Sequence, residues 1–528
     1  MKNYTIMKKS SLILFVIAFC VNASAQQAGT LNNQFSQDGW DTSIFGNNNG
    51  FKITKTIIQP DGKILACAEA YFPSEATQAI IVRYNTDGSL DTSFGGGDGV
   101  VRTKDDPTID LWFNGENMAL QSTGKMIIIG DVFTNTERIV RLNADGSLDD
   151  SFGINGIVDN NRQNAELFRH VGIQSDDKII ICGTERRLVN GVFKEHVFLW
   201  RFSSNGLRDN SFGSSGVVSY YSSDWNSGAN LWINDVIILP DDKILINQSF
   251  SAVSTNCVMV KKLNANGSVD SSFGTNGEFI KTVVDNTPLS NKFSNSAVQQ
   301  NGSIISSIIL STQEEQLHSD SMFRINAQGQ IDSSFSIIQE EQSSSTTELQ
   351  LKISGNKLYT IKKASGTNYG FDQINCYDLA GNLVSDFGND GIAIINQNDV
   401  PQSMLSKAAI SPNGNIYLVS HIPDPNNSSN SFFIASNVTG LNPNLSTNNN
   451  ESANKIVAFP NPTTGSVTLS NSDNVTIEKV EIIDSLGRIV FTETLNTSAI
   501  DLSYFSSGVY FLKIYSQDSI SQKRVLKL

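Results

Sequence analysis

Basic residues, and charged residues in general, are scarce in this chain of 528 residues. Charged residues make up 17% of it, and 38 lysines and arginines stand against 52 aspartates and glutamates, for a formal net charge of −14. A protein with that balance repels polyanions over long distances and lacks the basic surface that nucleic acid requires. The composition therefore argues against a nucleic-acid partner.

Residues that commonly carry catalysis are also few or poorly placed. The four histidines show no HExxH or comparable ligand spacing, so the sequence predicts no metal site. The serines lie in turn-like Gly, Asn and Asp surroundings, whereas a nucleophilic serine needs a strained G-x-S-x-G turn with His and Asp partners. No catalytic residue and no bound organic cofactor is predicted.

Long apolar runs are missing beyond the N-terminus. The first nine residues contain three lysines, and an apolar run follows over residues 12–21 and ends near the small-residue sequence ASA. This order is typical of a secretory signal peptide, predicted over residues 1–25 with cleavage between Ala25 and Gln26. No later segment approaches the ~20 apolar residues that cross a bilayer. We expect an exported mature chain without a transmembrane segment.

A short pattern ending in SFG recurs along the chain. It reads RYNTDGSLDTSFG at residues 83–95 and RLNADGSLDDSFG at residues 141–153. Other copies are RFSSNGLRDNSFG (201–213), KLNANGSVDSSFG (262–274), RINAQGQIDSSFS (324–336), CYDLAGNLVSDFG (376–388) and a clipped GTLNNQF (29–35). The phenylalanines of these copies are about sixty residues apart, which defines the length of one structural repeat.

A second pattern alternates with the first and places a tight turn between two apolar runs. Its copies are QPDGKIL (59–65), QSTGKMI (121–127), QSDDKII (174–180), LPDDKIL (239–245), QQNGSII (299–305), ISGNKLY (353–359) and SPNGNIY (411–417). Asp-Gly or Asn-Gly at such a turn supplies the positive φ of a tight hairpin. Each repeat offers four short strands, and the seven repeats predict an all-β protein with a seven-bladed β-propeller.

The ends of the repeat region suggest how the ring closes. The first SFG-like copy, at residues 31–35, has no strand before it, and the last blade ends at residues 431–440 without an SFG strand after it. The N-terminal segment can supply the outer strand that the last blade lacks. Such closure removes free sheet edges, which otherwise invite aggregation.

Together the two patterns resemble the delta-sixty repeat family of β-propeller modules in bacterial secreted and surface proteins. The resemblance covers residues 26–446, the predicted propeller domain. It departs from the pattern at Ser336, which replaces the glycine, and at residues 384–386, where the Leu-Asp-x-Ser order is lost. The resemblance implies a fold and an extracellular location, because the family has no single activity.

The repeat stops before the C-terminal segment. Residues 447–455 are polar and read as a linker, and residues 456–528 alternate apolar and polar positions between Gly-bearing turns, as a small β-sandwich does. This segment resembles the type A C-terminal sorting domain of the type IX (Por) secretion system of Bacteroidota. The matching residues are Pro460, Asn461, Pro462, Gly465, Gly487, Gly508, Tyr510, Lys523 and Lys527. The resemblance implies the type IX machinery as a partner and delivery to the outer cell surface or the medium.

Candidate ligand-binding residues lie in the long segments between an SFG strand and the next hairpin, which should share one face of the propeller. Aromatic side chains beside Asp and Asn suit stacking on a sugar or anchoring a protein. The candidates are Asp105, Asp106, Tyr220, Tyr221, Asp224 and Trp225. Paired carboxylates for glycoside cleavage would have to come from different blades, and the loop acids Asp105, Asp106, Asp224 and Glu340 read more simply as solvated side chains.

Repeated polar and cysteine positions have structural interpretations. The turns at residues 85–91 and 143–149 could hold Ca²⁺ among their oxygens, but turn geometry accounts for the same residues. Their recurring aspartates are expected to accept backbone hydrogen bonds between blades: Asp91, Asp149, Asp209, Asp270 and Asp332. Cys67 and Cys182 occupy equivalent positions in non-adjacent blades, so we expect buried free thiols instead of a disulfide.

These patterns predict an exported propeller that acts as a binding, adhesion or scaffold module, for a glycan or another surface protein. A secreted polysaccharide-active enzyme, with its site on one propeller face, is the first alternative. It would require two or more acids, or a histidine and an acid, to converge at one end of the channel. A purely structural spacer is the second alternative, and it would bind no ligand.

Overall fold

The computed structural model contains only strands among the residues it describes, and these divide into two units, Met1–Pro443 and Asn444–Leu528. The described residues are 27–32, 34–36, 40–43, 50–71, 78–103, 105, 109, 111, 118–132, 136–161, 167–189, 192–221, 230–252, 255–283, 295–311, 317–336, 338–343, 349–363, 372–395, 407–424, 427–441, 456–459, 463–471, 477–483, 489–494, 499–506, 508–516 and 519–527. Within these ranges, no helix is long and apolar enough to cross a membrane. The prediction of an all-β protein is confirmed.

The described part of the first unit forms seven four-stranded antiparallel sheets. The first sheet is β2 (Gly50–Ile58), β3 (Ile64–Tyr71), β4 (Gln78–Tyr84) and β5 (Val100–Arg102). The second is β6 (Met118–Leu120), β7 (Met126–Val132), β8 (Thr136–Leu142) and β9 (Ile157–Asn161). The third is β10 (Leu167–Ile173), β11 (Ile179–Val189), β12 (Val192–Phe202) and β13 (Val217–Tyr221). The fourth is β14 (Asn230–Ile238), β15 (Ile244–Ala252), β16 (Thr255–Leu263) and β17 (Glu278–Val283).

The remaining sheets of this unit follow the same order. The fifth is β18 (Ser296–Val298), β19 (Ile304–Ser311), β20 (Leu317–Ile325) and β21 (Ile338–Ser343). The sixth is β22 (Gln350–Ser354), β23 (Lys357–Lys363), β24 (Asp372–Asp378) and β25 (Ile392–Ile395). The seventh takes β26 (Lys407–Ile410), β27 (Ile416–Asp424) and β28 (Asn427–Val438) from the end of the repeat region and β1 (Trp40–Ser43) from its beginning.

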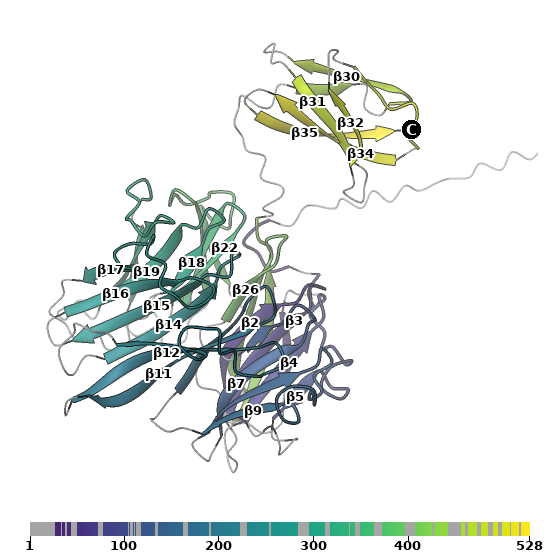
Figure 1. Cartoon of the computed structure of the whole chain (residues 1–528). Coiled ribbons are helices and arrows are strands. Elements are labelled where there is room, and N and C mark those ends of the chain that lie inside the picture. The colour runs from purple at the N-terminus through teal and green to yellow at the C-terminus, as the bar shows by residue number, and fades with distance from the viewer. Residues whose placement is uncertain are drawn as a thin grey trace, which may run out of the picture. The chain divides into compact units, whose positions relative to one another are not determined.

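Strand β1 closes the ring as the sequence predicted. It pairs antiparallel with β28, with Trp40 opposite Ser436 and Ser43 opposite Phe433. A further bridge between Leu31 and Val438 extends this contact. The seventh sheet packs against the first, so β26, drawn in green, lies beside β2, drawn in purple (Figure 1).

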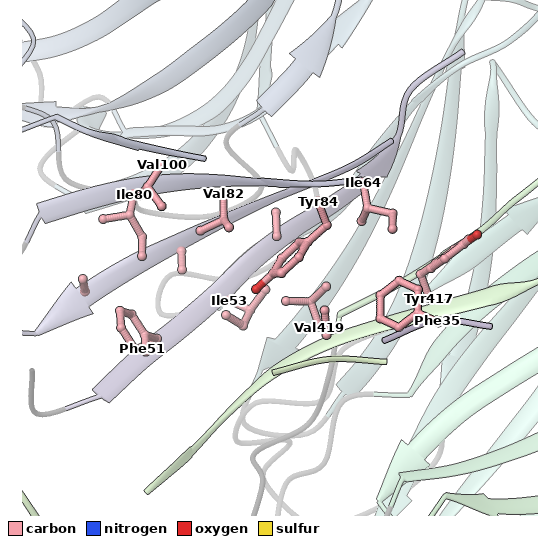
Figure 2. Close-up of a cluster of buried hydrophobic side chains, with 14 residues drawn as sticks. Phe35, Phe51, Ile53, Ile64, Ile80, Val82, Tyr84, Val100, Tyr417 and Val419 are labelled. Carbon is pink, nitrogen blue, oxygen red and sulfur yellow. The ribbon is translucent and has the colours of Figure 1, made fainter. Parts of the chain in front are cut away.

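Apolar side chains hold neighbouring sheets together because each sheet buries both of its faces. Successive residues of a strand point to opposite faces. On β3, Ile64 packs in the cluster shared with the seventh sheet, whereas Leu65 packs in the cluster shared with the second sheet. Figure 2 shows the cluster between the first and seventh sheets, where Tyr417 and Val419 meet side chains of the first sheet.

The second unit contains two sheets packed around one apolar core. One sheet is β29 (Ile456–Phe459), β30 (Ser466–Asn471) and β33 (Ala499–Asp501), and the other is β32 (Ile489–Thr494), β31 (Ile477–Ile483), β34 (Gly508–Ser516) and β35 (Ser519–Lys527). Its core includes Val467 from the first of these sheets and Val480, Leu512 and Val525 from the second. This arrangement is the predicted β-sandwich.

Candidate functional site

The SFG pattern links each sheet to the next through the backbone. The residue after each phenylalanine donates its N–H to a carbonyl in the turn of the following sheet, at N···O distances of 2.7–3.0 Å. In the described residues these bonds are Ser36 to Asp87, Gly95 to Asp145, Gly153 to Asn205, Gly213 to Asn266, Gly274 to Gln328, Ser336 to Ala380 and Gly388 to Ala28. The last bond returns to the N-terminal segment, so the links run around the whole ring.

A group of charged side chains reinforces this link in the first sheet. Asp91 accepts hydrogen bonds from Lys63 Nζ at 2.8 Å, from Arg83 Nε at 2.6 Å and from Ser93 Oγ at 2.7 Å. We call Lys63, Arg83, Asp91 and Ser93, with their counterparts in other sheets, the charged cluster. Basic and acidic partners also pair in the second to fifth sheets: Arg141 with Asp149, Arg201 with Asp209, Lys262 with Asp270 and Arg324 with Asp332.

The charged cluster corrects one sequence prediction. The cluster aspartates accept hydrogen bonds within their own sheet, and the arginine makes the bond between sheets. Arg83 Nη1 donates to the carbonyl of Ala144, and Arg201 Nη1 donates to that of Ala265 at 2.7 Å. The arginine also covers the SFG phenylalanine, with Arg83 Cζ 4.4 Å from the ring centroid of Phe94. An ion pair thus orients the group that ties two sheets together.

The electrostatics of the cluster follow from its geometry. Burial alone would raise the pKa of Asp91, but the hydrogen bonds from Lys63 and Ser93 and the charge of Arg83 outweigh it and hold that pKa well below its usual range. Asp149 has the same surroundings and the same direction of shift. These carboxylates are therefore ionised structural groups.

Two turns strengthen the inter-sheet contact in a different way. Asp177 and Asp242 stand where other hairpins have glycine, at φ of 64° and 62°, a region that costs an L-residue free energy. Their carboxylates accept hydrogen bonds from the preceding sheet: Ser122 N and Oγ reach Asp177 at 2.6 Å, and Ser175 N and Oγ reach Asp242 at 2.6 Å. The bonds offset the backbone strain.

The sixth and seventh sheets depart from this pattern. The register puts Cys376 and Asn437 at the position of Arg83, opposite Tyr359 and Tyr417. These tyrosines approach the phenylalanines that the arginines cover elsewhere, with ring centroids 5.7 Å apart for Tyr359 and Phe387 and 6.0 Å apart for Tyr417 and Phe35. Figure 2 shows Tyr417 and Phe35 side by side.

The seventh sheet replaces every charged member of the cluster with an amide. Asn437 stands in place of Arg83, Asn415 in place of Lys63 and Asn32 in place of Asp91. We call the interface of the first and seventh sheets the seam. It contains a cavity of about 820 Å³, the seam cavity, lined by Asn32, Gln34, Asn415, Tyr417 and Asn437 and by turn residues of the first sheet.

Two buried side-chain oxygens that line the seam cavity, Gln59 Oε1 and Asn437 Oδ1, are unsatisfied within the described part of the chain. Asn437 is 1% exposed, and its Oδ1 has no hydrogen-bond partner among the described residues. Beside it, burial raises the pKa of Tyr417, while hydrogen bonding from Asn415 and Asn437 acts in the opposite direction. The hydroxyl is therefore neutral. The cavity lining combines amides, hydroxyls and prolines with the carboxylates of Asp61 and Asp87 and the apolar side chains of Ile58 and Ile410.

The carboxylates at the cavity rim are already engaged. Asp61 Oδ1 accepts a hydrogen bond from Lys63 N at 3.1 Å, and Asp87 Oδ1 accepts from Ser89 N at 3.0 Å and Ser89 Oγ at 2.7 Å. The second of these belongs to a turn considered for Ca²⁺, and its oxygens serve turn geometry here. Among the described residues, no group of three or more His, Cys, Asp or Glu side chains is arranged to hold a metal ion.

Some of the residues predicted to lie in loops lie in a strand instead. Tyr220 and Tyr221 lie in strand β13, so the prediction that they are loop residues is wrong. The Tyr220 hydroxyl accepts a hydrogen bond from Gln248 Nε2 at 2.5 Å, and burial raises the pKa of Tyr220 well above its usual value. Tyr220 therefore belongs to the packing between the third and fourth sheets.

The other predicted residues are only partly described. Asp105 is exposed and lines a groove of about 600 Å³ between the first and second sheets. Asp106, Asp224 and Trp225 lie outside the described residues, as does the side chain of Glu340. The structure thus brings none of these candidates together into one described site.

The cysteine prediction is confirmed for the described residues. Cys67, Cys182, Cys257 and Cys376 are buried free thiols. Burial raises the pKa of each, to about 12 for Cys257 and Cys376. Neutral, inaccessible thiols behave as small apolar side chains.

Residues of the predicted sorting motif lie on two neighbouring strands and one turn. Gly508 and Tyr510 belong to β34, Lys523 and Lys527 belong to β35, and Gly508 is paired with Lys527. Gly465 donates its N–H to Thr463 Oγ1 at 3.1 Å in the turn before β30. Pro460, Asn461, Pro462, Gly487, the linker 447–455 and the cleavage residues Ala25 and Gln26 lie outside the described residues.

Comparisons with known proteins agree with both units. The chain matches the secretion system C-terminal sorting domain over residues 457–527 and a domain of unknown function (DUF5122) described as a β-propeller over residues 59–94, 121–152 and 239–273. The seven sheets and these matches define a secreted β-propeller built from delta-sixty-type repeats. It carries a type IX sorting domain, which directs it to the outer surface or the extracellular space. No curated protein matches the chain.

Several solved structures resemble the chain weakly. An ulvan lyase of polysaccharide lyase family PL25 is 11% identical, with 76% of this chain and 96% of that one covered at a TM-score of 0.39. A mutant of the NanB sialidase from Streptococcus pneumoniae is 8% identical, with coverage of 76% and 70% and a TM-score of 0.37. The Nup133 β-propeller domain of Vanderwaltozyma polyspora is 11% identical, with coverage of 76% and 98% and a TM-score of 0.37. Such likeness carries no argument about activity.

The seam residues were missed as a candidate site. The signal is present in the sequence, because the seventh repeat has Asn at the positions of Lys63, Arg83 and Asp91. Recognising this signal requires aligning residues 29–35, one by one, with the corresponding positions of the other repeats.

Proposed function

We propose that the propeller is a binding module that works at the outer cell surface or in the extracellular space, with the seam cavity as its site. The observation that carries this proposal is the cavity of about 820 Å³ that opens where the charged cluster gives way to amides. Its volume lies within the range of ligand pockets, about 300–1,000 Å³.

The unsatisfied Asn437 Oδ1 supports the same interpretation. A buried polar atom without a partner costs roughly 1–3 kcal/mol of stability. The first, second, third and fifth sheets have an arrangement better suited to folding alone, since their arginine hydrogen-bonds to the next turn and covers the phenylalanine. A ligand that hydrogen-bonds to Asn437 would offset the cost.

The test is a thermal-shift measurement on the secreted full-length protein against polysaccharides and surface proteins, with Ca²⁺ and with chelator. A ligand at a hundred times its dissociation constant stabilises the folded state by about 2.7 kcal/mol. We expect a selective rise in the unfolding temperature with one ligand class. If no ligand shifts the temperature, the protein is a spacer, and if a polysaccharide is shortened, the protein is an enzyme.

A further inference from the structure

We propose that the seam cavity takes an uncharged, hydroxyl-rich ligand, that is, a neutral oligosaccharide or a segment of a neutral polysaccharide. This proposal rests on the proposed binding function and names the ligand class for the same site. It follows from the chemistry of the cavity wall, from its charge and from what each residue replaces.

The wall offers matched donors and acceptors. A side-chain amide presents both an N–H₂ donor and a carbonyl acceptor, and Asn32, Gln34, Asn415 and Asn437 each contribute one to the cavity, although the Asn32 Oδ1 already accepts a hydrogen bond from Gln34 N at 3.1 Å. A sugar hydroxyl also donates and accepts, so pairs of adjacent hydroxyls can satisfy such amides. The buried Oδ1 of Asn437, which has no partner among the described residues, is available to accept a hydrogen bond from the ligand.

The charge of the cavity disfavours anionic ligands. The part of its lining that the structure describes includes the carboxylates Asp61 and Asp87 but no lysine, arginine or histidine. A sulfate or uronate group would therefore enter without a basic partner, in a protein whose formal net charge is −14. Acidic polysaccharides should bind less well than neutral ones.

The replacement of charged side chains by amides also disfavours a cationic ligand, although a guanidinium occupies the position of Asn437 in other sheets. The carboxylate that orients Arg83 is Asp91, and its counterpart here is the neutral Asn32. The phenylalanine that would lie under a guanidinium, Phe35, is already packed against Tyr417. An arginine side chain from a partner protein would thus lack the counterpart of Asp91 that orients Arg83, and would find the Phe35 ring already covered.

The decisive variant rebuilds the charged cluster in the seventh sheet. Asn32→Asp combined with Asn437→Arg restores the acid and the arginine of the first sheet, which pair at 2.6 Å there, and fills the cavity. The matched control is Asn266→Asp combined with Asn205→Arg, which makes the same exchanges at exposed turn residues of the third and fourth sheets. Asn437→Ala serves as a second variant, because it removes the unsatisfied Oδ1 without filling the cavity.

The experiment measures calorimetric binding of neutral hexasaccharides, among them gluco-, manno- and xylo-oligosaccharides, to the full-length protein, with alginate and an arginine-rich peptide as charged competitors. We expect one neutral series to bind. The rebuilt variant should lose at least tenfold in affinity while its unfolding temperature stays equal or rises, and the control should bind normally. Asn437→Ala should also bind at least several-fold more weakly.

Other outcomes separate the two proposals. Binding of alginate or of the peptide, abolished in the rebuilt variant, would overturn the ligand class and leave the binding function in place. Binding of a neutral oligosaccharide that the rebuilt variant and Asn437→Ala retain at full affinity would remove the seam cavity as its site. If the wild-type protein binds none of these probes and none of the broader panel, the binding function fails as well.

Discussion

The packing between neighbouring sheets of the propeller can be tested first at the contact between an SFG phenylalanine and the turn of the next sheet. Phe152 is fully buried, the Arg141 guanidinium lies 4.8 Å from its ring centroid, and a Cβ placed on Gly206 of the next sheet would lie 2.9 Å from the ring. Truncating a buried phenylalanine to alanine costs about 3–5 kcal/mol. We expect Phe152→Ala to lower the free energy of unfolding by that amount in denaturant titrations of the full-length protein.

A double-mutant cycle shows whether the contact is the cause. Gly206→Ala should itself destabilise the protein, because φ is 89° and the new methyl group would press on the ring. Left-handed backbone alone costs an L-residue about 1–2 kcal/mol. In the Phe152→Ala background the aromatic ring is absent, so the methyl group of Gly206→Ala no longer presses on it. The double variant should therefore lose less unfolding free energy than the sum of the two single losses, by about 0.5–3 kcal/mol.

The matched control is Gly124→Ala, which has a similar φ of 78° but places its Cβ in ordinary contact, 3.7 Å from the Ala144 Cβ. It should combine additively with Phe152→Ala. Additive losses for Phe152→Ala and Gly206→Ala would refute the proposed contact between the two sheets. An unchanged unfolding free energy for Phe152→Ala would remove that ring from the core.

Three further outcomes are expected. The pKa values of Asp91 and Asp149 lie below the unfolded value of about 3.9, so their stabilisation is present above that pH and is lost as the pH falls below it. Asp91→Asn should flatten the acid side of an unfolding-temperature profile, and an unaltered profile would contradict the pKa shift. Burial raises the pKa of Cys67 and Cys376, so a thiol reagent should label them only after unfolding, and rapid labelling of the native protein would place them at the surface. Deleting residues 456–528 should hold the propeller in the periplasm, and its appearance on intact cells, detected with an antibody, would show that export does not need the sorting domain.

Sequence reasoning succeeded where the structural signal is local. The hairpin at Gly62 and the turn at Gly88 could be predicted because positive φ, here 86° and 90°, is a property of a few adjacent residues. It failed for Tyr220, because the length of the outer strand β13 depends on pairing with β12 and not on the residues of the loop. The role of Asp91 was also misread, since its partner Lys63 comes from another turn of the same sheet.

The repeat, the all-β class, the closing strand and the sorting domain could all be inferred from the amino-acid sequence. These follow from periodic apolar positions, from turn residues and from motifs, each of which acts over short stretches of chain. The roles of the polar residues became visible in the folded protein, because many of their partners lie in the neighbouring sheet. The seam cavity is the clearest case: Asn32 and Asn437 come from opposite ends of the propeller region and line one cavity only because the ring closes between them.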